Sequence, residues 1–311
     1  MDKKTFTIMR SYKNVTIVEK TAQFIFTFFA LVAVAAVVSI TGYMLVSGTP
    51  AIFEIGFKEI LFGNVWEPTS AEPSFGILYV IITSIFGTVL AILLGVPVGV
   101  FTAVFLAETA PKKLAAVVKP AVELLAGIPS VIYGLLGILI LNPLMFKLEL
   151  ILFEGSTTHQ FTGGSNLISA VIVLAIMILP TVINVSESAI KAVPSHMKSA
   201  SLAMGASHIQ TIFKVILPAA KSGIITAIVL GVGRAIGEAM AISLVSGSSV
   251  NFPLPFNSVR FLTTAIVSEM GYATDTHRKV LFTIGLVLFA FIMLINITLT
   301  KILKKGELSN D

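Results

Sequence analysis

Two charged residues, Arg234 and Glu238, lie inside an apolar run near residues 222–246. A charge at the depth of a lipid bilayer costs at least about 2.5 kcal/mol, so such residues usually face a bundle interior or a polar pathway. Spaced by four on a helix, the two side chains lie on one face and can partly neutralise each other. Arginine also presents a fork of N–H donors that matches the oxygens of a phosphate group. The pair therefore predicts either a site for an oxyanion or a structural ion pair that fixes helix packing.

Small residues and a proline extend this candidate chemistry. Gly231, Gly233 and Gly237 flank the charged pair, where they either leave room for a ligand or serve only in helix packing. Ser130 follows Pro129, and a proline in a membrane helix either frees backbone groups to line a path or makes a kink without a ligand. We expect Ser130 to contribute to the substrate pathway.

Several other kinds of chemistry are excluded. The chain has no G-x-x-x-x-G-K-[ST] loop to hold nucleotide phosphates, so any ATP must be hydrolysed by a partner chain. Its four histidines are scattered without metal-ligand spacing, and it has no cysteine for a disulfide or a thiolate. We expect no catalytic residue, no metal and no cofactor.

Composition indicates an all-α polytopic membrane protein. Hydrophobic residues make up 56% of the chain and charged residues 12%, and the mean hydropathy is +0.97, which no soluble globular domain shows. Apolar runs long enough to span a bilayer as helices predict six transmembrane helices. They lie near residues 22–46, 75–107, 124–146, 167–186, 222–246 and 280–300.

The distribution of basic residues predicts the orientation. With the N-terminus inside, fifteen of the 21 Lys and Arg residues fall on the cytoplasmic side, five outside and one, Arg234, within the membrane. Both termini are then cytoplasmic. We expect a cytoplasmic segment over residues 1–20, a single transmembrane domain over 21–305 and a tail over 306–311. Anionic lipid accounts for the net charge of +5, and no nucleic-acid partner is expected.

Three residues near the expected span ends have simpler interpretations. Glu108 and Glu123 are expected to be solvated charges at cytoplasmic ends of neighbouring spans. Trp66, the single tryptophan, falls in an external loop, where it either anchors at the membrane interface or forms part of a docking surface.

The segment 194–218 predicts a short helix-turn-helix on the cytoplasmic side. Apolar residues recur at helical spacing on both sides of Gly205, which can adopt the left-handed conformation that ends a helix. Ser207, with Gln210 three residues later, has the pattern of a capping box that opens the second helix. Such a segment either docks a cytoplasmic partner or lies on the membrane surface as a simple connection.

The spacing in this segment resembles the EAA loop of ABC importer permeases, which carries a coupling helix that docks into an ATPase subunit. One residue departs from that pattern, because Ser199 stands where the family has Glu. The resemblance implies coupling to an ATPase through Ala200, Gly205, Ser207, Ile216, Leu217 and Pro218.

Three segments resemble one family in particular, the phosphate-specific (Pst) importer permeases of the PstC-like type. They are LLAGIPSVIYGLLGILIL (124–141), LAMGAS to ILPAA (202–220) and GRAIGEAMAI (233–242), with a weaker likeness over 62–84. The resemblance implies a type I ABC importer permease with the MetI-like fold, in which Arg234 and Glu238 take part in phosphate passage.

The same resemblance implies a set of partners and a location. The partners are a second homologous PstA-like permease, two PstB-like ATPase subunits and a PstS-like extracytoplasmic phosphate-binding protein. Membrane lipid surrounds the chain, and the location is the bacterial cell membrane.

Three alternatives remain open from the residues. The same machine could carry another oxyanion such as molybdate, sulfate or phosphonate, because arginine chemistry does not separate these. A proton-driven secondary transporter would use Glu238 as a proton relay and need no ATPase. A regulatory membrane protein would sense phosphate without moving it.

Overall fold

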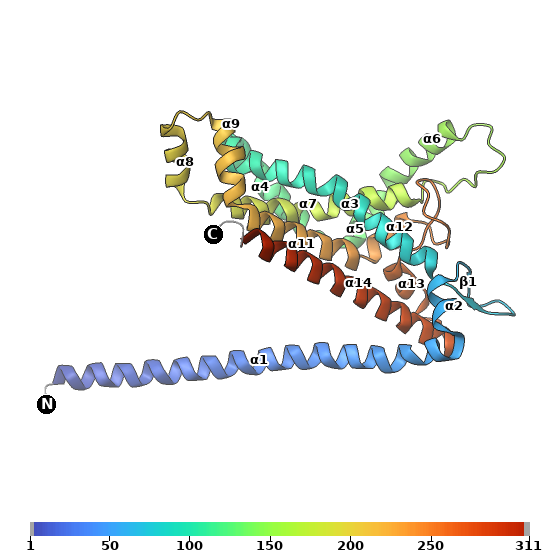
Figure 1. Cartoon of the computed structure of the whole chain (residues 1–311), viewed down its shortest axis with the longest axis horizontal. Helices are drawn as coiled ribbons and strands as arrows, with labels where there is room; N and C mark the ends of the chain where they lie inside the picture. Colours follow the sequence, from blue (N-terminus) through green and yellow to red (C-terminus); the bar gives the residue numbers. More distant parts are fainter. Residues whose placement is uncertain (1–2, 308–311) are drawn as a thin grey trace.

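The computed structural model describes residues 3–307, with side chains described for residues 19–298 and 301. Residues 1–2 and 308–311, which belong to the expected terminal segments 1–20 and 306–311, lie outside the described residues. The regular secondary structure of the described residues is helical apart from one small antiparallel hairpin (Figure 1). Its helices are α1 (Lys3–Ile55), α2 (Phe57–Phe62), α3 (Leu78–Val104), α4 (Lys112–Gly127), α5 (Ser130–Leu136), α6 (Asn142–Leu152), α7 (Leu167–Lys191), α8 (Ser195–Ala203), α9 (His208–Thr211), α10 (Leu217–Ala219), α11 (Lys221–Gly237), α12 (Met240–Val245), α13 (Leu262–Glu269) and α14 (Asp275–Glu307). Three π-helical segments, η1 (Phe105–Thr109), η2 (Gly137–Leu141) and η3 (Ile212–Ile216), interrupt them, and strands β1 (Trp66–Glu67) and β2 (Ser74–Phe75) form the hairpin.

Within the described part of the chain, five helical segments are long and apolar enough to cross a membrane, and a bent pair of helices makes a sixth candidate. The pair, His208–Ala219 and Lys221–Gly237, is bent by 69°. The five segments are Glu19–Ile55, Leu78–Thr109, Ser130–Leu152, Leu167–Lys191 and Asp275–Thr298. The protein is therefore an all-α polytopic membrane protein, as expected.

Two expected spans are wrong in their boundaries. The run 124–146 is broken, because Ile128 and Pro129 are extended and a new helix begins at Ser130. Pro129 has no N–H to donate and disfavours a helical conformation at the residue before it. The run 222–246 is also broken, because α11 ends at Gly237 and α12 begins at Met240.

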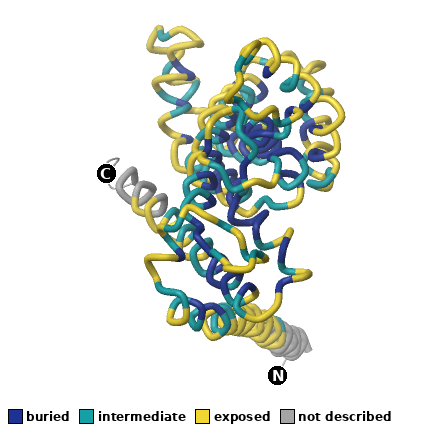
Figure 2. Tube along the Cα trace, turned by 90° about the vertical axis from the view of Figure 1, so that its right-hand side faces the viewer, coloured by how far each residue is buried: buried dark blue, intermediate teal, exposed yellow. Residues whose placement is uncertain are grey.

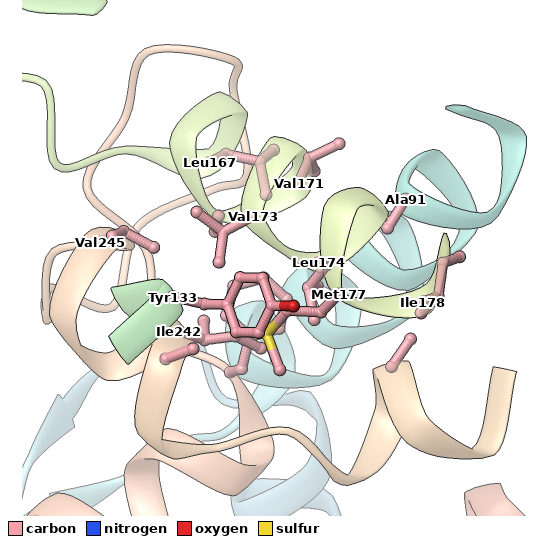
Figure 3. Packing of buried hydrophobic residues seen from close by; sticks show 14 of the residues in the cluster. Ala91, Tyr133, Leu167, Val171, Val173, Leu174, Met177, Ile178, Ile242 and Val245 are labelled. Carbon is pink, nitrogen blue, oxygen red and sulfur yellow. The ribbon is translucent and has the colours of Figure 1, made fainter. Parts of the chain in front are cut away.

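Helix α7 is the centre of the bundle. Its apolar side chains pack against α3, α5, α11 and α12, and Figure 3 shows Leu174 and Met177 next to Tyr133 and Ile242. In Figure 2 the buried residues gather inside this part of the bundle. The buried positions recur along 25 residues of α7, as expected for a helix surrounded by others.

Helix α1 lies apart from the bundle over most of its length (Figure 1). It meets α14 near its own C-terminal end, where the Thr283 hydroxyl donates a hydrogen bond to the Gly48 carbonyl at 2.8 Å. A Cβ on Gly48 would lie 2.9 Å from the α14 backbone, so only glycine allows this approach. The apolar membrane segment of α1 is otherwise exposed in the single chain.

A buried carboxylate joins the hairpin to the last two helices. Glu269, at the end of α13, accepts hydrogen bonds from Trp66 Nε1 at 3.1 Å and from Arg260, and its Oε2 lies 2.7 Å from His277 Nε2 in α14. The Trp66 indole N–H is thus used inside the chain. This contact fixes the hairpin against α13 and α14.

Candidate functional site

Arg234 lies half-buried in the last turn of α11. Its neighbour Ala235 belongs to the central core, so packing fixes the position of this turn. A cation near the C-terminal end of a helix is favoured by the helix dipole. Among the residues that the structure describes, the Thr181 hydroxyl on α7 is the one hydrogen-bond partner of the guanidinium, at a long 3.4 Å. Most of its five N–H donors are therefore open to a ligand.

Glu238 is not on the same helix face as Arg234. Its backbone is extended (φ −73°, ψ 128°) just after α11 ends. Its Oε1 accepts a hydrogen bond from the Ala241 N–H at 3.0 Å, at the start of α12, and its carbonyl accepts one from the Thr263 hydroxyl at 2.7 Å. Within the described part of the chain, Arg234 and Glu238 form no ion pair. The predicted shared face is wrong, because capping of α12 replaces continuation of the helix.

Ser130 is the first residue of α5, directly after the break at Pro129. Three residues later, the Tyr133 hydroxyl donates a hydrogen bond to the Leu125 carbonyl at 2.7 Å, and the same carbonyl at the end of α4 accepts the Ile128 N–H at 3.3 Å. The break is therefore a stable structure held from both sides and not a kink inside one helix. Ser130 is half-buried.

The two helices that begin after the two breaks pack against each other. A Cβ added to Gly134 in α5 would lie 3.0 Å from Cα of Ala241 in α12 and 2.7 Å from a Leu244 methyl. Ala235, which follows Arg234 in α11, lies in the same buried cluster as Tyr133 and Ala241. The fold thus brings α5, which starts at Ser130, and α12, which starts beyond Glu238, to the same region as Arg234.

The glycines near Arg234 divide into two kinds. Gly231 packs on α7, since its Cβ would lie 3.0 Å from a Val182 methyl. Gly233 and Gly237 have no atom within 4 Å of the Cβ position, and neither has Gly127 at the end of α4. These three exposed glycines leave the surface beside both breaks open to a ligand or to the backbone of another chain.

The segment 194–218 has the predicted turn. Gly205 adopts φ +85°, and the Ser207 hydroxyl accepts from the Gln210 N–H at 3.2 Å while Gln210 Oε1 accepts from the Ser207 N–H at 2.9 Å. This reciprocal pair is a complete capping box. The expected helix-turn-helix, with a left-handed glycine between α8 and α9, is confirmed.

The apolar residues of the segment 194–218 form one buried set and one exposed set. Ile212 and Ile216 are buried against the ends of α3 and α7, whereas Ile209 and Phe213 are exposed. Met204 at the turn is 89% exposed, so an apolar tip projects from the bundle. Of the remaining residues predicted for coupling, Ala200 and Pro218 are exposed and Leu217 is half-buried. Exposed apolar groups gathered at one tip are typical of an interaction surface.

The contacts of three further polar residues, Glu108, Glu187 and Thr181, were not predicted from the sequence. Glu108 is not a solvated end charge, because it forms an ion pair with Lys198 of α8 and its side chain is 10% exposed. Glu187 of α7 is buried and pairs with Lys191 and, at 3.6 Å, with Lys119 of α4. The contact of Thr181 with Arg234 could not be predicted, because the sequence shows only a hydroxyl residue within an apolar run. Glu123 is exposed, as expected.

Comparison with known proteins identifies the family. The family model described as "Binding-protein-dependent transport system inner membrane component" matches residues 95–306, which is more than half of the chain. The chain is 37% identical to the "Probable ABC transporter permease protein YqgH" of Bacillus subtilis, over 93% of both chains. It is 33% identical to the "Phosphate transport system permease protein PstC" of Pasteurella multocida and 34% to that of Xylella fastidiosa strain 9a5c, over 84% to 85% of each chain.

Solved structures share the fold at lower identity. The inward-facing MetNI methionine ABC transporter matches with a TM-score of 0.57 at 21% identity, over 74% of this chain and 95% of that one. A bacterial alginate ABC transporter, solved with its alginate-bound periplasmic protein, matches with a TM-score of 0.57 at 15% identity, over 86% and 92%. This chain therefore belongs to the family of binding-protein-dependent transport system inner membrane components, the permease subunits of ABC importers.

Proposed function

We propose that this chain forms half of the transmembrane pathway of an ATP-driven importer for inorganic phosphate. The observation that carries the proposal is Arg234, an arginine held in a broken membrane helix with one long hydrogen bond and an open glycine surface beside it. Its guanidinium can donate two parallel hydrogen bonds to phosphate oxygens, and the low dielectric of the site strengthens them. Relatives named phosphate transport permeases support this choice of substrate.

The surroundings of Arg234 suit a passing anion. The Glu238 carboxylate accepts the Ala241 N–H and has no ion pair with Arg234, so it does not neutralise the guanidinium directly. The Ser130 hydroxyl, at the start of α5, would add a second donor for the anion. Phosphate would then pass between Arg234 and a second permease chain, which would pack on the surface marked by Gly127, Gly233 and Gly237.

The likeness to phosphate transport permeases supports a proposed assembly. A second homologous, PstA-like permease completes the path, a PstS-like binding protein delivers phosphate from outside, and two PstB-like ATPases hydrolyse ATP. Both termini are cytoplasmic, which places the loop 194–218 beside the ATPases. The exposed apolar tip at Met204, Ile209 and Phe213 is the surface that an ATPase would cover. Closure of the ATPases would move this loop and switch the side to which the path is open.

The test is uptake of labelled phosphate by a host that lacks its own high-affinity phosphate permease, with this chain and its neighbouring genes restored. We expect vanadate-sensitive uptake that excess molybdate or sulfate does not reduce. Uptake lost to molybdate or sulfate would keep the importer and replace its substrate by another oxyanion. Uptake that survives without the ATPase subunits would contradict the ATP-driven mechanism.

A further inference from the structure

Helix α8 is attached to the rest of the chain by few contacts. None of its nine residues is buried, so apolar packing does not hold it in place. The Ser201 hydroxyl lies 2.9 Å from the Thr211 hydroxyl of α9, and Lys198 pairs with Glu108. Ser199 donates a hydrogen bond only to the Ser195 carbonyl within α8, at 3.2 Å. Since so short a helix has little stability of its own, these two polar contacts decide where α8 lies.

Glu108 is held in place by the packing of η1 against α7. It belongs to η1, the π-helical end of the second span, which closes with a hydrogen bond from the Ala110 N–H to the Phe105 carbonyl at 2.7 Å. The preceding residues Val104 and Leu106 are buried in two separate apolar clusters that include residues of α7. A π-turn adds one residue to the helical repeat and so turns the side chains that follow it. The carboxylate is thereby fixed relative to α3 and α7.

A cavity lies between α8 and the neighbouring ends of η1 and α7. The cavity has a volume of about 230 Å³. Its lining includes Glu108, Ile190, Val193, Pro194, Lys198 and Ile216. The cavity leaves α8 room to shift, and the Glu108–Lys198 ion pair crosses the same region.

We infer that the Glu108–Lys198 ion pair is the positioning contact through which movement of α8 reaches the second span. This inference rests on the proposed function in one respect, because the proposed function assigns an ATPase to the loop 194–218. The Glu108 side chain is 10% exposed and that of Lys198 35%, so water screens the pair less than it screens a surface pair. The contact links α8 directly to η1, the end of the second span, in addition to the covalent connections of α8 to α7 and α9.

A distance measurement tests the contact without any substrate. Because the chain has no cysteine, Ala203→Cys in α8 and Ala116→Cys in α4 can carry two spin labels with no competing site. In the assembled complex we expect Glu108→Gln to broaden the label-to-label distance distribution about twofold. The Glu108→Lys, Lys198→Glu double variant should narrow it again. The matched control is Glu54→Gln, which breaks the external Glu54–Lys279 ion pair and should leave the distribution unchanged.

Transport gives the second measurement. Coupling between two distant sites typically changes the affinity at one of them 5- to 150-fold. On that scale, we expect each single charge reversal at Glu108 or Lys198 to lower the amount of phosphate moved per ATP by about tenfold. The double reversal should restore the phosphate moved per ATP to within about threefold of the parent value. Single variants that behave like the parent, or a double variant as poor as the singles, would overturn the inference. If the parent complex moves no phosphate, the proposed function fails, and the distance measurement alone decides the role of the pair.

Discussion

The Glu238 carboxylate accepts a hydrogen bond from the Ala241 N–H at 3.0 Å and so caps helix α12, while Arg234, four residues earlier, pairs instead with the Thr181 hydroxyl. The two charges therefore have separate tasks. Each also lies at the helix end that the dipole favours, Arg234 near the C-terminus of α11 and Glu238 at the N-terminus of α12. This arrangement keeps a membrane helix broken beside an arginine that retains open donors.

The capping role of Glu238 predicts a difference between two substitutions. Glu238→Gln keeps an oxygen that accepts the Ala241 N–H, so uptake should stay within about twofold of the parent. Glu238→Ala removes the cap, which costs about 1 kcal/mol of stability, and should lower uptake several-fold. The measurement is phosphate uptake normalised to assembled complex. If Gln is as harmful as Ala, the charge of Glu238 itself is needed, as a proton relay would require.

The turn at Gly205 predicts uncoupling. Gly205 adopts φ +85°, a conformation that costs a side chain such as valine at least about 1 kcal/mol. In Gly205→Val we expect ATP hydrolysis to continue while phosphate moved per ATP falls. Gly155→Val is a matched control, since Gly155 also has a positive φ of +77° and open space, but lies after α6. Equal coupling in the two variants would show that the turn in the loop 194–218 is not required.

The exposed glycines Gly127, Gly233 and Gly237 predict where another chain or the substrate approaches. Gly237→Leu should leave the stability of the isolated chain unchanged, because nothing lies within 4 Å of its Cβ position, but should reduce assembly or uptake. Gly223→Leu in the same helix should destabilise the isolated chain by about 1 to 3 kcal/mol, because a Cβ there would lie 2.3 Å from Ala189 Cβ. Thermal unfolding in detergent and uptake distinguish the two. Full uptake by the Gly237 variant would place the pathway elsewhere.

The buried Glu269 carboxylate predicts a change in stability that the fluorescence of Trp66 can report. Glu269→Ala removes the acceptor shared by Trp66, Arg260 and His277, and loss of one partner of a buried ion pair typically costs about 3 to 5 kcal/mol. Trp66 is the single tryptophan, so its fluorescence reports on this site alone. We expect a red-shifted emission and a lower unfolding temperature. Unchanged emission would mean that Glu269 does not hold the hairpin.

Local features of the fold could be predicted from the sequence. The left-handed Gly205 and the Ser207 capping box are set by residues within three positions of each other, and both were predicted. Four of the six expected spans correspond to observed helices, because their apolar runs are uninterrupted. The expected continuous span 124–146 was wrong, because α4 ends at Gly127 and a new helix begins at Ser130, after Pro129.

Contacts between distant residues could not be predicted. The end of α11 depends on Thr263, which is 25 positions from Glu238, and no periodic pattern marks it. Glu108 and Lys198 are 90 positions apart, and Trp66 and Glu269 are 203 apart. In each case a polar residue with an ordinary local sequence acquires its partner only when the helices pack.

Substitution of Arg234 tests the central claim most directly. Labelled phosphate uptake would be measured for Arg234→Ala and Arg234→Lys in the complete complex, with Thr226→Ala on the exposed surface of α11 as the control. We expect Arg234→Ala to abolish uptake while assembly and basal ATP hydrolysis remain, since alanine removes the fork of N–H donors. Arg234→Lys should retain a small fraction, because lysine keeps the charge but not the fork. Normal uptake by Arg234→Ala in an assembled complex would contradict the assignment of phosphate passage to this site.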